Sequence, residues 1–319
     1  MSVTGWRIPE GRLARMSVAS RSLYPFVLAA MCETPPDRRG STRVLDLPAG
    51  GGVLSFALRA AGFDVTPSDL FPEYLEQAKP GAQGKTAVGL FREQTRAKVP
   101  GWLSDVWLGH AAGRATPANT DVGTVPSDME APLPFEDSAF DAVVCVEGIE
   151  HVMDRHRTLS NIRRVMKPGG RLVITTPNLL SIRSRLATAL AGQRTLRSYI
   201  DEYTSVWGFS PDRTRIYHGH AFLISYFQLR YSLHHCGFRI RRLWNSNWSK
   251  SSMLLCPLAL PIAAATWYSQ RPAKKRFATW RSAGAFPPET PEPYREMFAH
   301  LLSPAMLFNA TLIVDAEAV

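Results

Sequence analysis

The stretch Val44-Leu45-Asp46-Leu47-Pro48-Ala49-Gly50-Gly51-Gly52 decides the fold of this 319-residue chain. It begins inside an apolar segment, residues 42–47, which predicts a strand. The next residues, 53–61, have helical apolar spacing, and Gly62 ends that helix. Residues 63–66 predict a second strand, which runs on to Asp69. A strand, a glycine turn, a helix and a strand in succession open a parallel α/β sheet.

The same alternation of strands and helices continues along most of the chain. Helical spacing covers residues 21–32, 70–79 and 155–166, the last of which is closed by the stop signal Lys167-Pro168-Gly169-Gly170. An aromatic-rich helical region is expected at 179–235. Further strands are expected at 121–127, 140–146, 171–176, 238–243 and 310–315. The pattern predicts a doubly wound α/β fold.

The sequence divides into three stretches. Residues 1–40 form an N-terminal helical segment, 41–178 form the core, and 179–319 form a helical cap followed by the last strands of the same sheet. Residues 80–120 are rich in Gly, Pro and Ala and interrupt the core where a brief connection is expected. They are therefore an insertion, either a lid over the site or a surface elaboration.

The net charge indicates which classes of partner the protein can bind, and the cysteine content indicates whether it contains a zinc site or disulfides. The formal charge is +10, which favours nucleic acid, phosphorylated ligands or anionic lipid, unless it is simply a solvated basic surface. The four cysteines are scattered without a CxxC pair, which argues against a zinc site or a disulfide framework. Because the N-terminus has no secretory pattern, we expect a cytoplasmic protein.

The glycine turn indicates a bound ligand, and its details exclude two ligand classes. Glycines between a strand and a helix let the backbone approach a ligand and present amides at a helix N-terminus. Ser55 stands where a dinucleotide fingerprint needs its third glycine, and no Gly-Lys-Ser/Thr follows. Asp46, Asp69 and Asp128 each end a strand. Three carboxylates at one sheet edge suit a cationic nucleoside, unless each merely caps a helix.

These motifs resemble those of class I S-adenosylmethionine (SAM) methyltransferases, in the broad group of ubiquinone-pathway and glycan- or lipid-modifying O-methyltransferases. VLDLPAGGG resembles motif I, GFDVTPSDL resembles motif II, and SDMEAPLPFEDSAFDAVVCVEGIEHV and RVMKPGGRLVITTPN resemble the blocks that follow. The resemblance covers residues 40–180. It implies SAM as cofactor and a Rossmann-like, mostly parallel seven-stranded sheet whose last strand is antiparallel.

The same resemblance implies a set of cofactor contacts. The turn glycines would flank the methionine moiety of SAM, and Asp46 would orient the turn and the amino group. Asp69 would hold the ribose, while Asp128 and Met129 would face the adenine. The full set of cofactor-binding residues is Asp46, Gly50, Gly52, Asp69, Leu70, Asp128, Met129 and Glu147.

Pro48 departs from the family pattern. It stands where the family's D-x-G-x-G-x-G has its first glycine, and proline fixes φ and removes an amide donor. We therefore expect weakened or reshaped cofactor binding. The departure also supports an alternative, a non-catalytic relative that acts as a binding or scaffolding subunit.

Glu147, Glu150 and His151 form the pattern E-x-x-E-H after the fourth core strand. Residues at i, i+3 and i+4 share one helical face, and hard carboxylates favour Mg²⁺ or Mn²⁺. The pattern resembles the metal-binding motif of ubiquinone-pathway O-methyltransferases and of small-RNA 2′-O-methyltransferases. Without a metal, His151 is the candidate general base, with Glu150 beside it. A purely structural role for all three is the remaining alternative.

His220 is a further candidate base or ligand. It lies in a region of aromatic and basic side chains that either walls an acceptor pocket or forms core. The other members of this region are Arg194, Arg197, Tyr199, Tyr203, Trp207, Arg215, Tyr217, His218, Phe222, Tyr226 and Phe227.

Residues 253–276 combine an apolar run with a basic cluster. The apolar part, 253–268, is too short to span a bilayer and contains two prolines. It is either a buried cap helix or, with the basic residues up to Arg276, a peripheral dock on an anionic membrane.

The patterns and the resemblance together predict a SAM-dependent methyltransferase that methylates an oxygen of a small-molecule, glycan or lipid-linked acceptor. An RNA 2′-O-methyltransferase is a further alternative. Nucleic acid is disfavoured because the basic residues are dispersed and no RNA-binding module is recognisable.

Overall fold

The computed structural model describes residues 23–71, 124–196, 200–201, 205–209, 216–246, 248–287 and 289–319. The chain forms two compact units, which we describe separately. Unit 1 comprises Met1–Pro177, Tyr199–Trp244 and Ile313–Val319, and unit 2 comprises Asn178–Ser198 and Asn245–Leu312. Most of the helix expected at 70–79 and all of the insertion expected at 80–120 lie outside the described residues.

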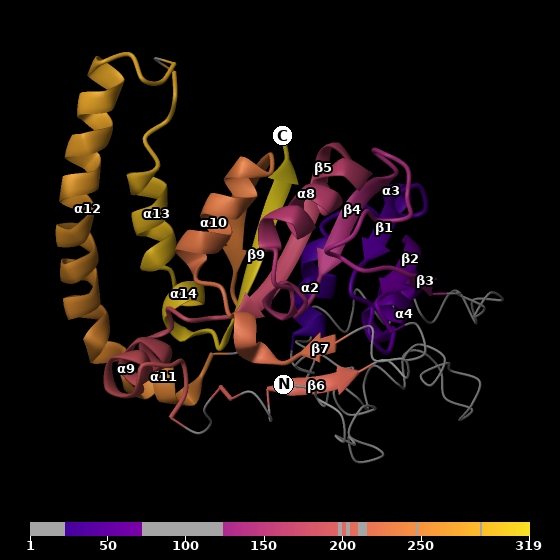
Figure 1. The fold of residues 1–319 in the computed structure, drawn as a ribbon, viewed down its shortest axis with the longest axis horizontal. Helices are drawn as coiled ribbons and strands as arrows, with labels where there is room; N and C mark the ends of the chain where they lie inside the picture. The colour runs from indigo at the N-terminus through magenta and orange to yellow at the C-terminus, as the bar shows by residue number, and fades with distance from the viewer. Residues whose placement is uncertain are drawn as a thin grey trace, which may run out of the picture. The chain divides into compact units, whose positions relative to one another are not determined.

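Unit 1 is built on a seven-stranded sheet in the order β3-β2-β1-β4-β5-β9-β8 (Figure 1). Neighbouring strands among β1 to β5 pair in parallel, whereas β8 and β9 pair antiparallel. This confirms the predicted fold class. The strands are β1 Arg43–Asp46, β2 Asp64–Asp69, β3 Val125–Pro126, β4 Phe140–Cys145, β5 Met166–Pro177, β8 Phe238–Trp244 and β9 Thr311–Ala318.

Helices cover the sheet because its central strands are apolar on both faces. Alternate residues such as Val44 and Val144 join a core cluster with Leu28 and Leu58, from helices α2 (Tyr24–Met31) and α4 (Val53–Ala60). A short helix, α3 (Pro36–Arg39), precedes β1. Helices α8 (Arg155–Val165) and α10 (Tyr226–His235) contact each other and strands β5 and β8. The core therefore lies on both sides of β1, β4 and β5.

Two elements differ from the sequence-based expectation. Strand β5 begins at Met166, directly after α8, and the register with β4 shifts between Phe140 and Ala142. Helix α8 ends at Val165, as the stop signal at residues 167–170 predicts, but those residues lie inside strand β5 and not in a loop before it. The region 179–235 is not all helical either, because β6 (Val206–Phe209) and β7 (Ile216–His218) form a two-stranded antiparallel sheet.

Unit 2 is helical in its described residues. Its helices are α9 (Ile182–Ala191), α11 (Lys250–Leu254), α12 (Ala259–Ser282), α13 (Tyr294–Leu301) and α14 (Pro304–Phe308). The side-chain amide of Asn178 donates to the carbonyls of Met306, at 2.8 Å, and Asn309, at 3.0 Å, which joins the two segments of the unit. Helix α12 has no buried residue, so the interpretation of residues 253–268 as a buried cap helix is wrong.

Candidate active site at the carboxyl edge of the sheet

The glycine turn adopts a backbone that favours glycine. Gly50 has φ 51°, and Gly52, the residue before α4, has φ 69°. Both angles lie in the left-handed region, where a Cβ is disfavoured. The turn connects the carboxyl end of β1 to the N-terminus of α4, which is where parallel sheets bind ligands.

Asp69, at the end of β2, holds this turn. Its Oδ2 accepts from the Gly50 amide at 2.7 Å and its Oδ1 accepts from the Phe71 amide at 2.8 Å. Asp69 therefore fixes the conformation of the turn, and its carboxylate is the type of acceptor that a ribose diol requires. The sequence placed Asp69 at this turn, and the structure brings the two together; Leu70 follows it and is half-buried.

Asp46 lies fully buried at the end of β1. The Ser55 hydroxyl donates to its Oδ2. Burial raises the pKa of Asp46 to about 7; the Ser55 hydrogen bond opposes the rise, and the nearby charge of Asp69 adds to it. A cation bound beside these two acids would favour the ionised form of Asp46.

Asp128 and Met129 follow β3, the strand that pairs with β2. Asp128 is exposed, and its Oδ1 accepts from the Glu130 amide at 2.8 Å. Met129 is buried, and its carbonyl accepts from the Asn161 side chain at 3.0 Å. Asp46, Asp69 and Asp128 thus all stand at the carboxyl ends of adjacent strands, next to a bare glycine backbone. These carboxylates fit SAM, which carries positive charge and a ribose diol.

Pro48 packs against Gly148, which lies in the loop that follows β4. A Cβ built on Gly148 would lie 2.3 Å from Cδ and 2.9 Å from Cγ of Pro48, distances that only the absence of a side chain permits. The proline ring therefore fills space that residue 148 leaves empty. The departure from the family turn is accommodated locally, while Gly50 and Gly52 keep their conformations.

Glu147 stands just beyond β4 with φ 50°, a strained conformation for a residue with a side chain. Its amide donates to Oγ1 of Thr175 at 2.9 Å, and the same hydroxyl donates to its Oε1 at 3.4 Å. The following helical turn covers only Ile149–His151. The expectation that Glu147 shares one helical face with Glu150 and His151 is therefore wrong.

A cluster of three other groups forms beside this strand end. Glu150 is buried, and one ligand atom each from Glu150, His151 and His220 lie within 4.8 Å of one another. The rings of His151 and His220 stack with centroids 5.4 Å apart. The guanidinium of Arg155 donates to the carbonyl of Phe222 and so ties the His220–Phe222 turn to α8. Residues from distant parts of the sequence thus meet at one point of unit 1.

His151 has a defined tautomer. Its Nδ1 lies 2.6 Å from the carbonyl oxygen of His218 and 3.2 Å from that of Gly219. A carbonyl oxygen only accepts, so Nδ1 carries the proton and Nε2 carries the lone pair. Burial lowers the pKa of His151, against the two carbonyl hydrogen bonds, so the neutral imidazole is favoured at neutral pH.

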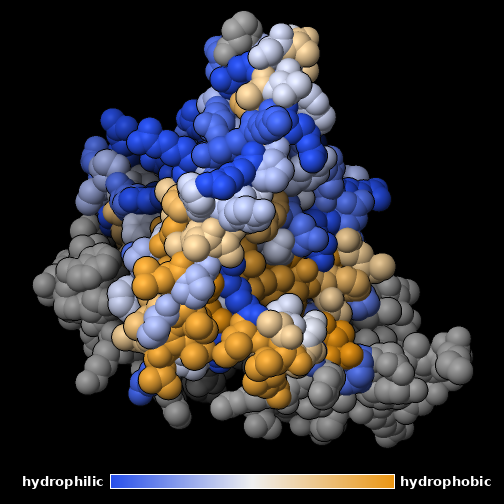
Figure 2. Space-filling view, turned by 90° about the vertical axis from the view of Figure 1, so that its left-hand side faces the viewer, coloured by the Kyte–Doolittle hydropathy of each residue, from blue (hydrophilic) through white to orange (hydrophobic). Residues whose placement is uncertain are grey.

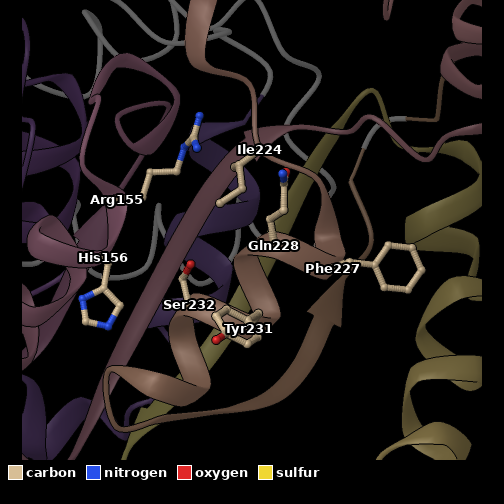
Figure 3. Close-up of a pocket in the computed structure, with 7 residues that line it drawn as sticks. All are labelled: Arg155, His156, Ile224, Phe227, Gln228, Tyr231 and Ser232. Atoms are coloured by element: carbon tan, nitrogen blue, oxygen red, sulfur yellow. The ribbon is translucent and has the colours of Figure 1, made fainter. Parts of the chain in front are cut away.

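A separate groove of about 510 Å³ lies between α8 and α10. Figure 3 shows Arg155 and His156 on α8, and Gln228, Tyr231 and Ser232 on α10. None of the expected cofactor contacts lines it, so we do not assign it to SAM.

Many of the side chains expected to wall an acceptor pocket lie outside the described part of the chain. Arg194, His218, His220, Phe222, Tyr226 and Phe227 are described, whereas the placement of Arg197, Tyr199, Tyr203, Trp207, Arg215 and Tyr217 side chains is not. The sequence alone missed the roles of Ser55, Thr175 and Gly148. No motif marks these residues, because each acts through contacts that only the folded chain creates.

The order of the strands and the glycine turn at their carboxyl ends define a Rossmann-like methyltransferase fold. The family model described as a methyltransferase domain matches residues 20–243. The chain belongs to this family.

Individual relatives match the chain at low sequence identity. A demethylmenaquinone methyltransferase of Streptomyces avermitilis is 32% identical over 138 residues, 43% of each chain. A ubiquinone biosynthesis O-methyltransferase of Xylella fastidiosa is 27% identical over 175 residues, 55% of each chain. A solved S-adenosylmethionine-dependent methyltransferase from Mesorhizobium loti is 17% identical with a TM-score of 0.45, covering 93% of this chain and 97% of that one. The chain thus spans about half the length of the curated relatives it matches.

Proposed function

We propose that the protein transfers the methyl group of SAM to a hydroxyl group of a small-molecule acceptor. Membership of the methyltransferase domain family supports methyl transfer, and the glycine turn flanked by Asp46 and Asp69 supports SAM as donor. The Xylella fastidiosa relatives are named as ubiquinone biosynthesis O-methyltransferases, which supports oxygen as the acceptor atom.

The tautomer of His151 is the observation that carries the choice of a hydroxyl acceptor. The carbonyl of His218 fixes the proton on Nδ1, at 2.6 Å, so the lone pair that a base needs lies on Nε2. SAM supplies an electrophilic methyl group on a sulfonium. The S–CH3 bond would break as the acceptor oxygen bonds to the methyl carbon, and the demethylated cofactor would leave as a neutral thioether. His151 would take the acceptor's proton at Nε2, and buried Glu150 would stabilise the imidazolium. Positioning of the acceptor supplies much of the remaining acceleration.

The test measures formation of the demethylated cofactor with a panel of catechols and demethylated quinones. We expect His151→Gln to lower kcat by about 100-fold or more with little change in cofactor affinity. His156→Gln is the matched control, because His156 is an exposed histidine on α8. Asp69→Ala should weaken cofactor binding by calorimetry. A fully active His151→Gln variant would contradict the assignment of the base.

A divalent-metal site is a second candidate role for the same cluster. Glu150, His151 and His220 would be its ligands, with the Nδ1 proton of His151 held by a backbone carbonyl as in many metal sites. Two imidazoles and one carboxylate suit Mn²⁺, Fe²⁺ or Zn²⁺ better than Mg²⁺. Such an ion would lower the pKa of the acceptor hydroxyl. Calorimetric binding of Mn²⁺ that Glu150→Gln abolishes, with loss of activity on chelation, would support it.

The same assays distinguish the possible classes of acceptor from one another, and they distinguish catalysis from a non-catalytic role. Glycan and lipid-linked acceptors belong in the panel, because a hydroxyl is common to them. A scaffolding protein would bind SAM but transfer no methyl group to any acceptor class. Gly148 makes room for Pro48, and Gly50 and Gly52 keep their positive φ angles. This favours the catalytic alternative.

A further inference from the structure

Unit 2 carries most of the net charge of the protein. Within its bounds the sequence has eleven Lys and Arg residues against three Glu, a formal charge of +8 out of the total of +10. No acidic residue occurs between positions 245 and 288. An anionic partner is therefore attracted to this unit far more strongly than to the rest of the chain.

The same unit exposes aliphatic side chains at one end. Figure 2 shows hydrophobic surface gathered on this face in the lower half of the view, where Figure 1 places α9, α11 and the start of α12. Leu254 is 83% exposed and Leu260 is 79% exposed, whereas a water-soluble surface usually scatters such side chains singly. We call this end the apolar foot; it comprises Leu186, Leu190, Met253, Leu254, Leu258 and Leu260.

Side-chain types follow one another along α12 in a fixed order. The apolar foot ends at Leu260, Trp267 and Tyr268 come next, and the basic cluster begins at Arg271 and runs to Arg276. Trp267 and Tyr268 are mainly exposed. With a rise of about 1.5 Å per residue, Leu260 and Trp267 stand about 10 Å apart along the helix. This distance is comparable to the roughly 5–10 Å depth to which apolar side chains are buried at a membrane interface.

The residues above the foot have the properties of a membrane interface. Trp and Tyr concentrate at the headgroup level, because their rings are apolar and carry one polar group. The guanidinium of Arg271 lies 3.6 Å from the ring centroid of Trp267, so charge and aromatic surface are held together. Lys274 is 3.8 Å from Glu292, whereas Lys275 and Arg276 are exposed. Aliphatic, aromatic and basic side chains thus occur in the order of bilayer depth.

We infer that unit 2 docks on an anionic membrane surface, with the apolar foot inserted below the headgroups and the basic cluster of α12 at the phosphate level. No described helix is long and apolar enough to cross a bilayer. Nucleic acid fits less well, because it offers no apolar phase for Leu254 and Leu260. The inference concerns unit 2 alone and does not depend on the reaction proposed for unit 1.

Vesicle co-sedimentation of the full chain tests this inference. We expect binding to vesicles of phosphatidylcholine with 30% phosphatidylglycerol and at least tenfold weaker binding to phosphatidylcholine alone. Removing two charges by Lys275→Gln with Arg276→Gln should weaken binding by roughly 10- to 30-fold, about fivefold per residue. Arg239→Gln with Arg241→Gln removes the same charge from exposed positions of β8 in unit 1 and should have a much smaller effect.

The apolar foot is tested by Leu254→Gln with Leu260→Gln, which changes no charge and which we expect to lower vesicle binding at least tenfold. Met153→Gln, at another exposed apolar position, is the control. Circular dichroism checks folding, and a depth measurement needs no foot variant: brominated lipids should quench Trp267 more than Trp280, as compared in Trp267→Phe and Trp280→Phe. Equal binding by the foot variant, equal quenching of both tryptophans, or steeply salt-dependent RNA binding without vesicle binding would overturn the inference.

Discussion

Replacing Asp46 with Asn should remove a large pH dependence from the stability of the protein. Burial raises the folded-state pKa of Asp46 from 3.8 to about 7, so the folded state holds a proton that the unfolded state has lost. Stability therefore falls as pH rises from the unfolded value of 3.8 to the folded value of about 7, and is constant above it. The shift corresponds to about 4 kcal/mol in full, of which roughly 2–3 kcal/mol falls between pH 5 and pH 8.

The measurement is urea unfolding of both proteins at pH 5 and pH 8, followed by circular dichroism. We expect the free energy of unfolding to fall between these values by roughly 2–3 kcal/mol more in the native protein than in Asp46→Asn. Titrating groups that do not interact with Asp46 cancel in this difference. Asp37→Asn, at an exposed carboxylate in α3, is the control and should behave like the native protein. Identical pH dependence in Asp46→Asn would refute the reasoning.

Two further predictions concern packing and ion pairing. Gly148→Ala places a methyl group 2.3 Å from the Pro48 ring and should cost about 1–3 kcal/mol in chemical denaturation; Pro48→Gly should restore most of the loss, and purely additive effects would contradict the contact. Arg171→Met removes the bidentate partner of the fully buried Asp315, at 2.7 and 3.1 Å, and should cost about 1.5–3 kcal/mol. The cost is no larger because Arg242 and Trp244 still contact this carboxylate. Exposed Arg239→Met should cost under about 1 kcal/mol.

Much of the carboxyl edge could be predicted from sequence because local signals and fold agree there. The apolar segment at 42–47, the glycine turn and the strand ending in Asp69 all occur where expected. Turn glycines are needed for their conformation, and Gly50 and Gly52 have the positive φ angles that this implies. Turn glycines can be predicted from the sequence because their conformational freedom is a property of glycine itself.

The remaining features depend on contacts between distant residues. Glu147 was placed on a helical face by its spacing, but its backbone is turned away and held by Thr175. His151 and His220 stand 69 positions apart, and only the fold stacks their rings. The exposure of α12 was equally hidden, because an apolar run predicts burial unless the solvent-facing surface is known. The spacing of residue types in the sequence predicts individual helices and strands, but it does not predict which elements pack against them.

Strands β8 and β9 pair antiparallel with Trp244 opposite Ile313, and residues 245–312 connect these two positions. In topological terms that whole helical segment is the loop of a β-hairpin. Since antiparallel neighbours can be joined by a two-residue turn such as Asn-Gly, the segment could be excised and the hairpin closed without altering the strand order. A shortened protein of this kind would show what the sheet and its strand-end carboxylates do in the absence of the helices within residues 245–312.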